Sequence, residues 1–306
     1  MNLSKLTSGP LTIGVELPLD NDWTSDGQRQ RLLDKRPFGV PDLSAHQSLA
    51  MQADELGFRA LWVRDVPLYD PSFGDAAQVF DPLVYLGFLS GVTRNILLGT
   101  AAIVLPLRNP WIVRKSAASV QALSGNRLLL GIASGDRPSE YPLFGADYET
   151  RGHAFRHGVE ILTGKQDHRL APGQAILPET QPPPLLSAGL SQQSPQWIGE
   201  HMSGWLAYPG TPEEHMRRVA LWRNVAGDKP YVSFIHLDYL DDAKAPRRRH
   251  RFGVQTGRDG LLRELEEMQS AGVNHIGLHF RRNQAPVADT LMRVAEDILG
   301  VFHETP

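Results

Sequence analysis

Cysteine is absent from the 306-residue chain. Its absence excludes disulfide bonds, thiolate metal ligands and cysteine nucleophiles, and with them the disulfide framework of small secreted proteins. An excess of charge of one sign is missing too, because 31 basic and 34 acidic residues leave a formal net charge of -3. A chain with this balance has no field that would attract nucleic acid or an anionic membrane surface, and we expect neither as a partner.

Long apolar runs are also lacking. The N-terminal stretch MNLSKLTSGPLTIGVELPLD has one lysine and no apolar segment of signal-peptide length, and nothing later approaches a membrane span. We therefore expect a cytoplasmic protein. The chain is 41% hydrophobic and 21% charged, as is typical of a globular protein, and no repeat or linker divides it. Residues 1–306 are expected to form a single domain.

Short β-rich segments alternate with helical patterns along the chain, and this alternation predicts the fold. The strand segments are apolar and bounded by turn residues: 11–17, 59–64, 95–105, 127–133, 184–190, 204–208, 231–240 and 274–280. Segments with apolar residues at helical spacing lie between them: 44–57, 109–125, 152–162, 195–202, 211–225, 259–272 and 287–299. Eight such strands predict an α/β fold of the (β/α)₈ TIM-barrel type, with a doubly wound open sheet as the alternative.

Capping residues predict where individual helices begin and end. Ser44 and Gln47 have the spacing of a capping box, and Asn109 precedes a proline at the first helical position. Gly125 follows the last apolar position of that second helix and is expected to end it.

In a barrel of this type the active site lies at the C-terminal ends of the strands and in the loops after them. These positions contain no Gly-x-Ser-x-Gly elbow, His-Glu-x-x-His, P-loop or Gly-x-Gly-x-x-Gly. The candidates by position are Glu16, Arg64, Asp65, Tyr69, Asp70, Asp75, Thr100, Ala101, Ala102, Ser134, Gly135, Asp136, Arg137, Gly189, Ser191, Ser194, Tyr208, His236 and His279.

Two polar clusters near the C-terminal strands invite a functional interpretation. HLDYLDD, from His236 to Asp242, is interpreted as a strand end that runs into an acidic loop, and a metal site there is the less favoured alternative. RRRHR, at 247–251, is interpreted as a solvated loop, with an anionic-substrate clamp as the alternative. We assign no metal ligand.

Two segments are unusual for the elements they occupy. The strand 95–105 has Gly99, Thr100, Ala101 and Ala102 at its centre, where a buried strand normally carries bulky side chains. In SAGLSQQSPQW, a strand end is followed by serines and a helix that starts near residue 195. Free amides and the helix dipole there are typical of an anion site, and plain capping by the last serine is the alternative.

Residues 99–136, GTAAIVLPLRNPWIVRKSAASVQALSGNRLLLGIASGD, resemble the bacterial-luciferase-like flavin-dependent monooxygenases and oxidoreductases. YPLFGADYETRGHAF and AGLSQQSPQWIGEHMSGWL share this resemblance, which extends from about Ile13 to Val301. LWVRDVPLYDPSFGD is similar to a subgroup of luciferase-type oxidoreductases. The resemblance implies a TIM barrel that uses reduced FMN, or alternatively the deazaflavin F420, with O₂ as co-substrate in the luciferase branch and an unknown small organic substrate.

The resemblance also implies roles for individual residues. Ala101 and Ala102 match a pair joined by a cis peptide at the floor of the flavin site, and residues 131–134 match the ring edge. The cofactor-binding residues implied in this way are Thr100, Ala101, Ala102, Ser134, Gly189, Leu190, Ser191, Ser194 and Tyr208, with the serines at the phosphate.

Two departures from the family affect catalysis. The luciferases carry a cysteine and a basic residue at Ala133 and Ser134, and many relatives have a histidine where this chain has Arg64 and Asp65, so light emission is not inferred. We expect Arg64 to stabilise negative charge on reduced flavin and Asp65 to orient Arg64. His279 or His236 is expected to donate a proton, and core packing of both is the alternative.

The leading hypothesis is an FMN-dependent monooxygenase or oxidoreductase. The alternatives are an F420-dependent hydride-transfer oxidoreductase and a non-catalytic flavin-binding barrel. Because no nicotinamide fingerprint is present, we expect a separate flavin reductase as a partner. The resemblance further implies a homodimer.

Overall fold

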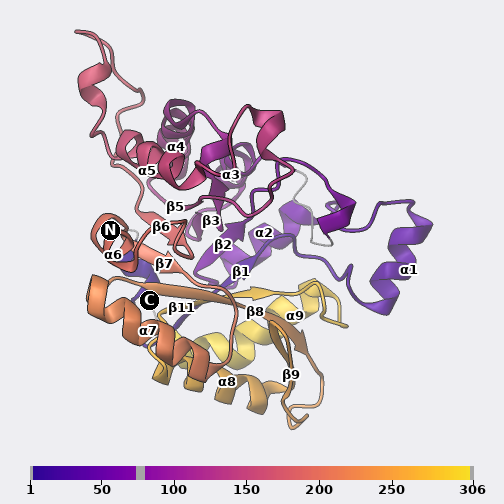
Figure 1. Ribbon diagram of the computed structural model, residues 1–306. Coiled ribbons are helices and arrows are strands. Elements are labelled where there is room, and N and C mark those ends of the chain that lie inside the picture. Colours follow the sequence, from indigo (N-terminus) through magenta and orange to yellow (C-terminus); the bar gives the residue numbers. More distant parts are fainter. Residues whose placement is uncertain (1–2, 74–79, 304–306) are drawn as a thin grey trace.

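The computed structural model describes residues 3–73 and 80–303. Eight parallel strands close into a barrel in the order β1-β2-β3-β5-β6-β7-β8-β11, and β11 pairs with β1 (Figure 1). This closure confirms the predicted TIM barrel and excludes the open sheet. The barrel strands are β1 Thr12–Glu16, β2 Ala60–Val63, β3 Leu97–Thr100, β5 Leu128–Ala133, β6 Leu185–Ala188, β7 Gly204–Leu206, β8 Tyr231–Tyr239 and β11 His275–His279.

The predicted strands all contain an observed strand, with one interruption and one addition. The segment 95–105 is split into β3 and β4 (Ile103–Val104) at the peptide between Ala101 and Ala102, which is cis as the resemblance implied. The basic segment 247–251, expected to be a loop, contributes β9 (Arg248–His250) to an antiparallel hairpin with β10 (Gly253–Thr256). β10 pairs in parallel with the second half of β8 and extends the rim of the barrel there.

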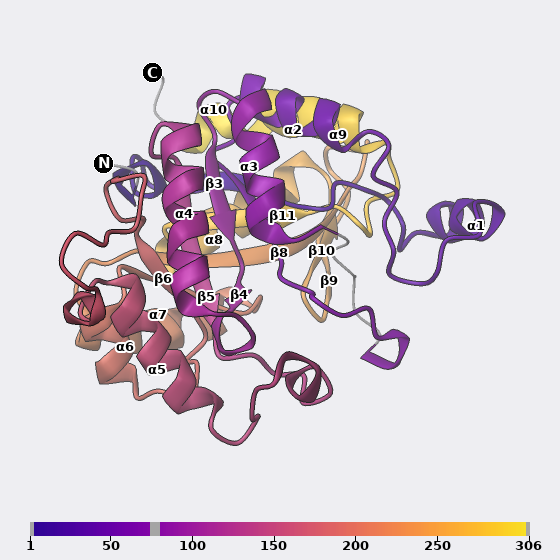
Figure 2. The same cartoon turned by 90° about the horizontal axis from the view of Figure 1, so that it is seen from above.

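Helices surround the barrel and connect its strands (Figures 1 and 2). Their bounds are α1 Ser25–Leu33, α2 His46–Glu55, α3 Pro82–Val92, α4 Pro110–Ser124, α5 Arg151–Leu162, α6 Pro195–His201, α7 Pro212–Ala226, α8 Arg258–Ser270, α9 Val287–Val294 and α10 Gly300–Phe302. A π-helical turn, Ala295–Leu299, joins the last two. No described helix combines the length and apolar character needed to cross a membrane.

The sequence did not reveal α1 and α3. The α3 sequence PLVYLGFLSGV is apolar on every side, so it has no polar face to mark a helical period. α1 has no buried residue and no apolar stripe, and it stands apart from the barrel in both views (Figures 1 and 2).

The capping predictions were right for α4 and wrong for α2. Asn109 caps α4 by accepting from two backbone amides, and Gly125 ends it in the left-handed conformation. At α2 the N-cap is Ala45, which makes no side-chain hydrogen bond, and the Ser44 amide donates to the Asp42 carboxylate two residues earlier. The predicted Ser44 capping box is therefore absent.

Trp62 fills the centre of the barrel and explains part of the small-residue strand. The indole lies against Gly99 on β3 and Gly277 on β11, so that a Cβ at either position would collide with a neighbouring ring. Gly99 therefore makes room for Trp62.

A chain of hydrogen bonds fixes His275 beneath Trp62. The indole Nε1–H can only donate, so His275 Nε2, 3.0 Å away, is the unprotonated nitrogen. The proton is then on Nδ1 and is donated to the Thr12 hydroxyl at 2.8 Å, which in turn donates to the Leu6 carbonyl. Both ring nitrogens of this fully buried histidine have a hydrogen-bond partner. Burial lowers its pKa to about 3.

An ion-pair network anchors the long connection from β1 to α1. The fully buried Arg281, just after β11, contacts Asp20 at 2.7 Å and Asp22 at 3.4 Å. Asp22 also binds Arg36, which lies beyond α1, at 2.6 Å. The Asp22 carboxylate therefore links the segment after α1 to the Arg281 guanidinium after β11. The Trp23 ring lies 5.1 Å from the Arg281 guanidinium carbon.

We expect the unfolding free energy to fall as the pH is lowered from about 7.5 to about 5.5. Burial lowers the pKa of His215 to about 4 and that of His236 and His275 to about 3. Below about pH 6.5 the unfolded chain therefore binds protons that the native protein does not, and each histidine removes about 1.4 kcal/mol per pH unit. Burial raises the pKa of Asp20 and Glu140 to about 6, which opposes this loss with fewer groups. Urea unfolding at three pH values measures the slope, and a flat or opposite slope contradicts this prediction.

Candidate functional site

A cavity of about 410 Å³ opens at the C-terminal ends of the strands, where the fold predicts the active site. The structure brings most of the sequence-predicted residues to its wall: Arg64, Asp65, Ala101, Ala102, Ser134, Gly189, Leu190, Ser191 and Tyr208. Thr100, Ser194, His236 and His279 do not line it, and their positions are described below.

One half of the cavity wall is built from small side chains. Ala101 and Ala102 follow β3, Ala133 ends β5 and Ala188 ends β6. These neighbouring strand ends give a surface of small apolar side chains, and Asp136, Arg137 and Glu140, from the loop after β5, line the cavity beyond it. A planar apolar ring system can lie on such a surface without displacing side chains.

The turn after β6 presents free amides beside this surface. Gly189, Ser191 and Gln192 have positive φ angles of 58°, 47° and 61°. Among the described residues, the amides of Leu190, Ser191 and Gln192 have no hydrogen-bond acceptor. Successive free amides in a left-handed turn are a recurring anion-binding arrangement in proteins. The Ser191 hydroxyl stabilises the turn by donating to the Ala188 carbonyl at 3.1 Å.

Helix α5 supports the same turn. The sequence did not suggest this contact, because the α5 residues are about forty positions from the turn. The Gln193 side chain donates to the Gly152 carbonyl at 2.8 Å and accepts from Arg156 at 2.8 Å. Arg151, at the start of α5, stacks on Tyr148 and keeps a buried Nε without a partner. Arg156 therefore places a cation against the turn.

Thr100 and Ser194 support the site from outside the cavity. Thr100 is fully buried and donates to the Gly131 carbonyl at 2.7 Å, so it joins β3 to β5 below the floor. Ser194 caps α6 by accepting from the Trp197 amide at 3.2 Å. The Ser194 side chain therefore acts as a helix cap in this structure, which was the alternative to its predicted place in an anion site.

The other half of the wall is charged. Glu16, at the end of β1, accepts from Arg64 Nε at 2.5 Å. The Asp65 carboxylate, predicted to orient Arg64, is buried and accepts from Arg108, at 2.8 and 3.0 Å, and from the Val104 amide. Glu16 occupies the orienting position because β1 and β2 are paired and their interior residues are neighbours.

His236 and His279 lie behind the charged half, on β8 and β11. Their rings are stacked with centroids 4.2 Å apart, and Trp23 packs against both. Burial and the nearby Arg64 lower the pKa of His236 to about 3 and that of His279 well below its usual range. Both imidazoles are therefore neutral at physiological pH.

The remaining polar candidates have partners elsewhere. Asp238 accepts from Gln255 and from the Gln284 amide, and the described part of the chain contains no group of three potential metal ligands. In the basic segment Arg247 and Arg249 both bind the buried Glu264, so they do not form an anion clamp.

Beyond Arg64 and Asp65, the described part of the loop after β2 does not bring Tyr69 or Asp70 to the cavity wall. Tyr69 donates to the Phe38 carbonyl, and Asp70 binds Ser72. Asp75 lies outside the described residues.

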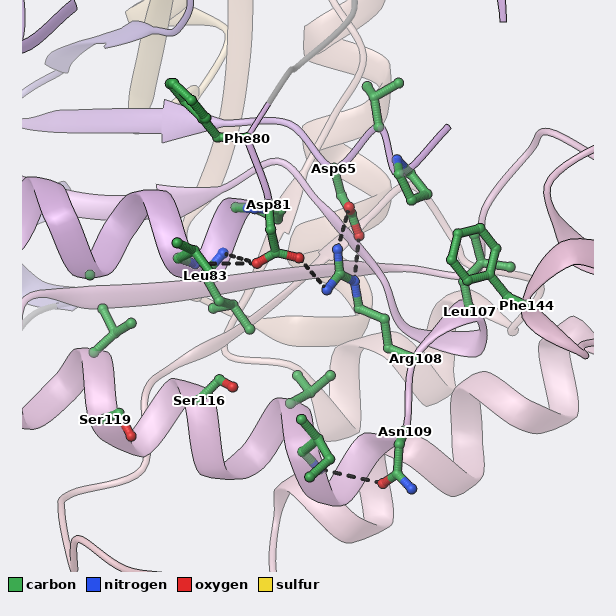
Figure 3. A pocket seen from close by; sticks show the side chains of 18 of the residues that line it. Asp65, Phe80, Asp81, Leu83, Leu107, Arg108, Asn109, Ser116, Ser119 and Phe144 are labelled. Atoms are coloured by element: carbon green, nitrogen blue, oxygen red, sulfur yellow. Dashed lines mark hydrogen bonds and ion pairs between the residues drawn. The ribbon is translucent and has the colours of Figure 1, made fainter. Parts of the chain in front are cut away.

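A larger groove, of about 770 Å³, lies outside the barrel between α3 and α4 (Figure 3). Arg108 spans its end and binds Asp65 on one side and Asp81 on the other, while Asn109 caps α4 (Figure 3). The rest of the wall is mainly apolar. Its charged groups are paired with one another, so the groove offers a contact surface and no reactive group.

A profile of the luciferase-like monooxygenase family matches residues 14–269, well over half of the chain. The chain belongs to this family. Its members are monooxygenases and related oxidoreductases, and the matched region includes the alanine floor, the turn after β6 and the Glu16–Arg64 pair.

Three solved structures share the fold of this luciferase-like chain. Monooxygenase RslO1 from Streptomyces bottropensis has a TM-score of 0.72 at 17% identity, covering 94% of this chain and 99% of that chain. An F420-dependent secondary alcohol dehydrogenase solved with an F420–acetone adduct scores 0.70 at 16% identity, with coverages of 94% and 98%. The oxygenating constituent of 3,6-diketocamphane monooxygenase from Pseudomonas putida, solved with FMN, scores 0.66 at 13% identity, with coverages of 94% and 98%.

The two buried histidines of β11 are expected to respond differently to the same substitution. His275→Phe leaves the Trp62 N–H and the Thr12 hydroxyl without their partner, and should cost about 2–4 kcal/mol of unfolding free energy. His279→Phe removes a ring whose two nitrogens have no partner, and should change the unfolding free energy by less than about 1 kcal/mol. Urea unfolding of both variants compares them directly. Equal losses would show that the two histidines have the same structural role.

Proposed function

We propose that the protein is an FMN-dependent monooxygenase that oxidises a small organic substrate with O₂. The observation that carries this proposal is the division of the cavity into an alanine-lined half with a free-amide turn and a charged half with Arg64 and Glu16. The first half fits a cofactor with a flat ring and an anionic tail. The second half is left to the substrate and to the charge that develops on reaction.

The residues of the first half fit FMN. The ring system would lie on the four alanines, with Ser134 at its edge. The phosphate would be held by the free amides of residues 190–192, with Arg156, which is bound to Gln193 of the same turn, offsetting its charge. Tyr208, which is 66% exposed at the rim, is placed to cover the cofactor from the solvent side.

A bound reduced flavin supplies the electrons for the oxidation. The chain supplies position and electrostatics. Arg64 lines the same cavity as the alanines and is held by Glu16, so it would stabilise negative charge that forms there. The neutral His279 and His236 lie next to this pair and are the proposed proton source.

The solved relatives support both FMN and its alternative. A neighbour solved with FMN and a monooxygenase favour the proposal, and the F420-dependent alcohol dehydrogenase favours a hydride-transferring reductase in the same barrel. A non-catalytic barrel is the least favoured alternative, because a buried Glu16 paired with the partly exposed Arg64, and two buried histidines, are costly to keep without a use.

Titration with FMN and with F420 decides between the cofactors. We expect FMN to bind at micromolar concentration, with quenching of flavin fluorescence, and riboflavin to bind at least about tenfold more weakly because it lacks the phosphate. Ala133→Leu should fill the floor and weaken FMN by at least about tenfold. Ala175→Leu, on the exposed segment between α5 and β6, is the control and should bind as the wild type does.

Tight binding of F420 alone would replace the proposal with the reductase alternative, and binding of neither cofactor would favour the non-catalytic barrel. Oxidation of NADH or NADPH with and without an added flavin reductase then tests the expected partner. Turnover that depends on the added reductase supports it.

We further propose that a second copy of this chain covers the groove between α3 and α4. Val84, Ile112 and Leu123 project from its walls with 72%, 63% and 67% of their surface exposed. Charged groups in the groove are already paired, so the same face of another copy could pack against it without burying a free charge (Figure 3).

Ile112→Asp is expected to convert the dimer to a monomer, because it would bury a carboxylate without a partner in the contact. Light scattering coupled to size exclusion measures the mass of each species. Leu221→Asp, at an exposed position of α7, is the control and should remain dimeric. A monomeric wild type, or two variants with the same mass as the wild type, contradicts this assignment.

A further inference from the structure

Buried polar atoms without hydrogen-bond partners gather at one place beside the cavity. Buried polar groups in proteins are nearly always paired, so such a concentration needs a physical reason. Among the described residues these atoms are Glu16 Oε2, Asp20 Oδ2, Trp23 Nε1, His236 Nδ1, His250 Nε2, His279 Nδ1 and Nε2, and Arg281 Nη1.

Four of these residues form a continuous series across neighbouring strands. Glu16 is beside His279, because the preceding residues of β1 and β11 are register partners. His279 and His236 are themselves register partners and stack at 4.2 Å. His250, on the rim strand β9, lies 6.4 Å from His236 between ring centroids and is partly exposed to solvent. The series therefore runs from the cavity wall to the surface.

The charges around the series keep its imidazoles neutral. Arg64 on β2 and Arg281 and Arg282 after β11 face the pair, and they add to burial in lowering the pKa of His279. Burial and Arg282 also lower the pKa of His250, and Asp238 only partly offsets this.

A neutral imidazole has one N–H and one bare nitrogen, so it can accept a proton on one side while it releases one on the other. Stacked rings do not hydrogen-bond to each other directly, and bridging water is needed to connect them.

The barrel floor shows that this arrangement is not forced by burial. His275 is on the same strand as His279, is equally buried, and has both nitrogens satisfied by Trp62 and Thr12. The chain thus pairs a buried histidine where the role is packing. The histidines at the mouth keep their nitrogens available.

We propose that Glu16, His279, His236 and His250, bridged by bound water, form a relay that carries protons from the solvent at the β9–β10 hairpin to the cavity. The relay rests on the proposed function for its use. Insertion of one oxygen atom of O₂ into a substrate, with release of the other as water, takes up two electrons and two protons. A reduced flavin bound as its anion brings both electrons and one proton, so the second proton has to reach the cavity from solvent.

Imidazole ¹⁵N NMR on the protein without cofactor tests the relay. We expect the ring N–H of His279 to exchange rapidly with water although it is fully buried, and that of His275 to be protected. His250→Phe should slow exchange at His279 by about tenfold or more, because the rim connection is lost. His168→Phe, at an exposed position outside the barrel, is the control and should leave the rate unchanged.

The relay is overturned if His279 is as protected as His275, or if exchange at His279 is the same in His250→Phe and the wild type. Far-UV circular dichroism and urea midpoints confirm that each variant is folded, and His250→Gln serves as a second variant if the phenylalanine disturbs the hairpin.

A second measurement uses the FMN-loaded protein and separates this proposal from the proposed function. Reoxidation of reduced FMN by O₂ to hydrogen peroxide also takes up one proton beyond the one on the anion. His250→Ala should slow this step by about tenfold, enlarge its solvent isotope effect, and be restored by added imidazole. Absence of imidazole rescue counts against the relay. Failure of FMN to bind counts against the proposed function alone, and the NMR result then still decides the relay.

Discussion

The bond from the Trp62 indole to His275 organises the interior of this barrel. A closed barrel of eight strands has to be filled by side chains, and here one tryptophan occupies the centre, with Gly99 on β3 giving it room. The indole donates in one direction only, which fixes the proton of the histidine and, through Thr12, the N-terminal turn below it. With the floor closed in this way, the barrel opens into a cavity at its C-terminal mouth.

The wall of the cavity at the mouth has an apolar and a charged half, because different strands carry different side chains just above the floor. Alanines follow β3 and end β5 and β6. On the other side Glu16 ends β1, Arg64 follows β2, His236 lies within β8 and His279 ends β11. Neighbouring strands of a parallel barrel are in fixed register, so this division is a property of the fold and needs no loop to maintain it. A site built on strands holds its geometry more firmly than one built on loops.

Much of the barrel and about half of the site were predictable from sequence. Parallel strands are buried on both faces and appear as apolar runs, so all eight were found. The alanines were found because small side chains are unusual at the centre of a buried strand. The turn near Ser191 was found because its serines lie between a strand end and a helix start. α3 was missed because it lacks a polar face. The pairing of Asp65 with Arg108, and the gathering of Trp23, His250 and the two mouth histidines, depend on residues distant in sequence, and only the folded chain brings them together.

The arm that carries α1 illustrates how the ends of the chain are tied to each other. Trp23 donates its amide to the Arg281 carbonyl at 2.9 Å and packs on both mouth histidines, while α1 beyond it buries nothing. The arm therefore has two parts with opposite tolerance. Insertions, deletions or fused tags within α1 can vary freely as the chain diverges, whereas the few residues around Trp23 are held to one length and one sequence.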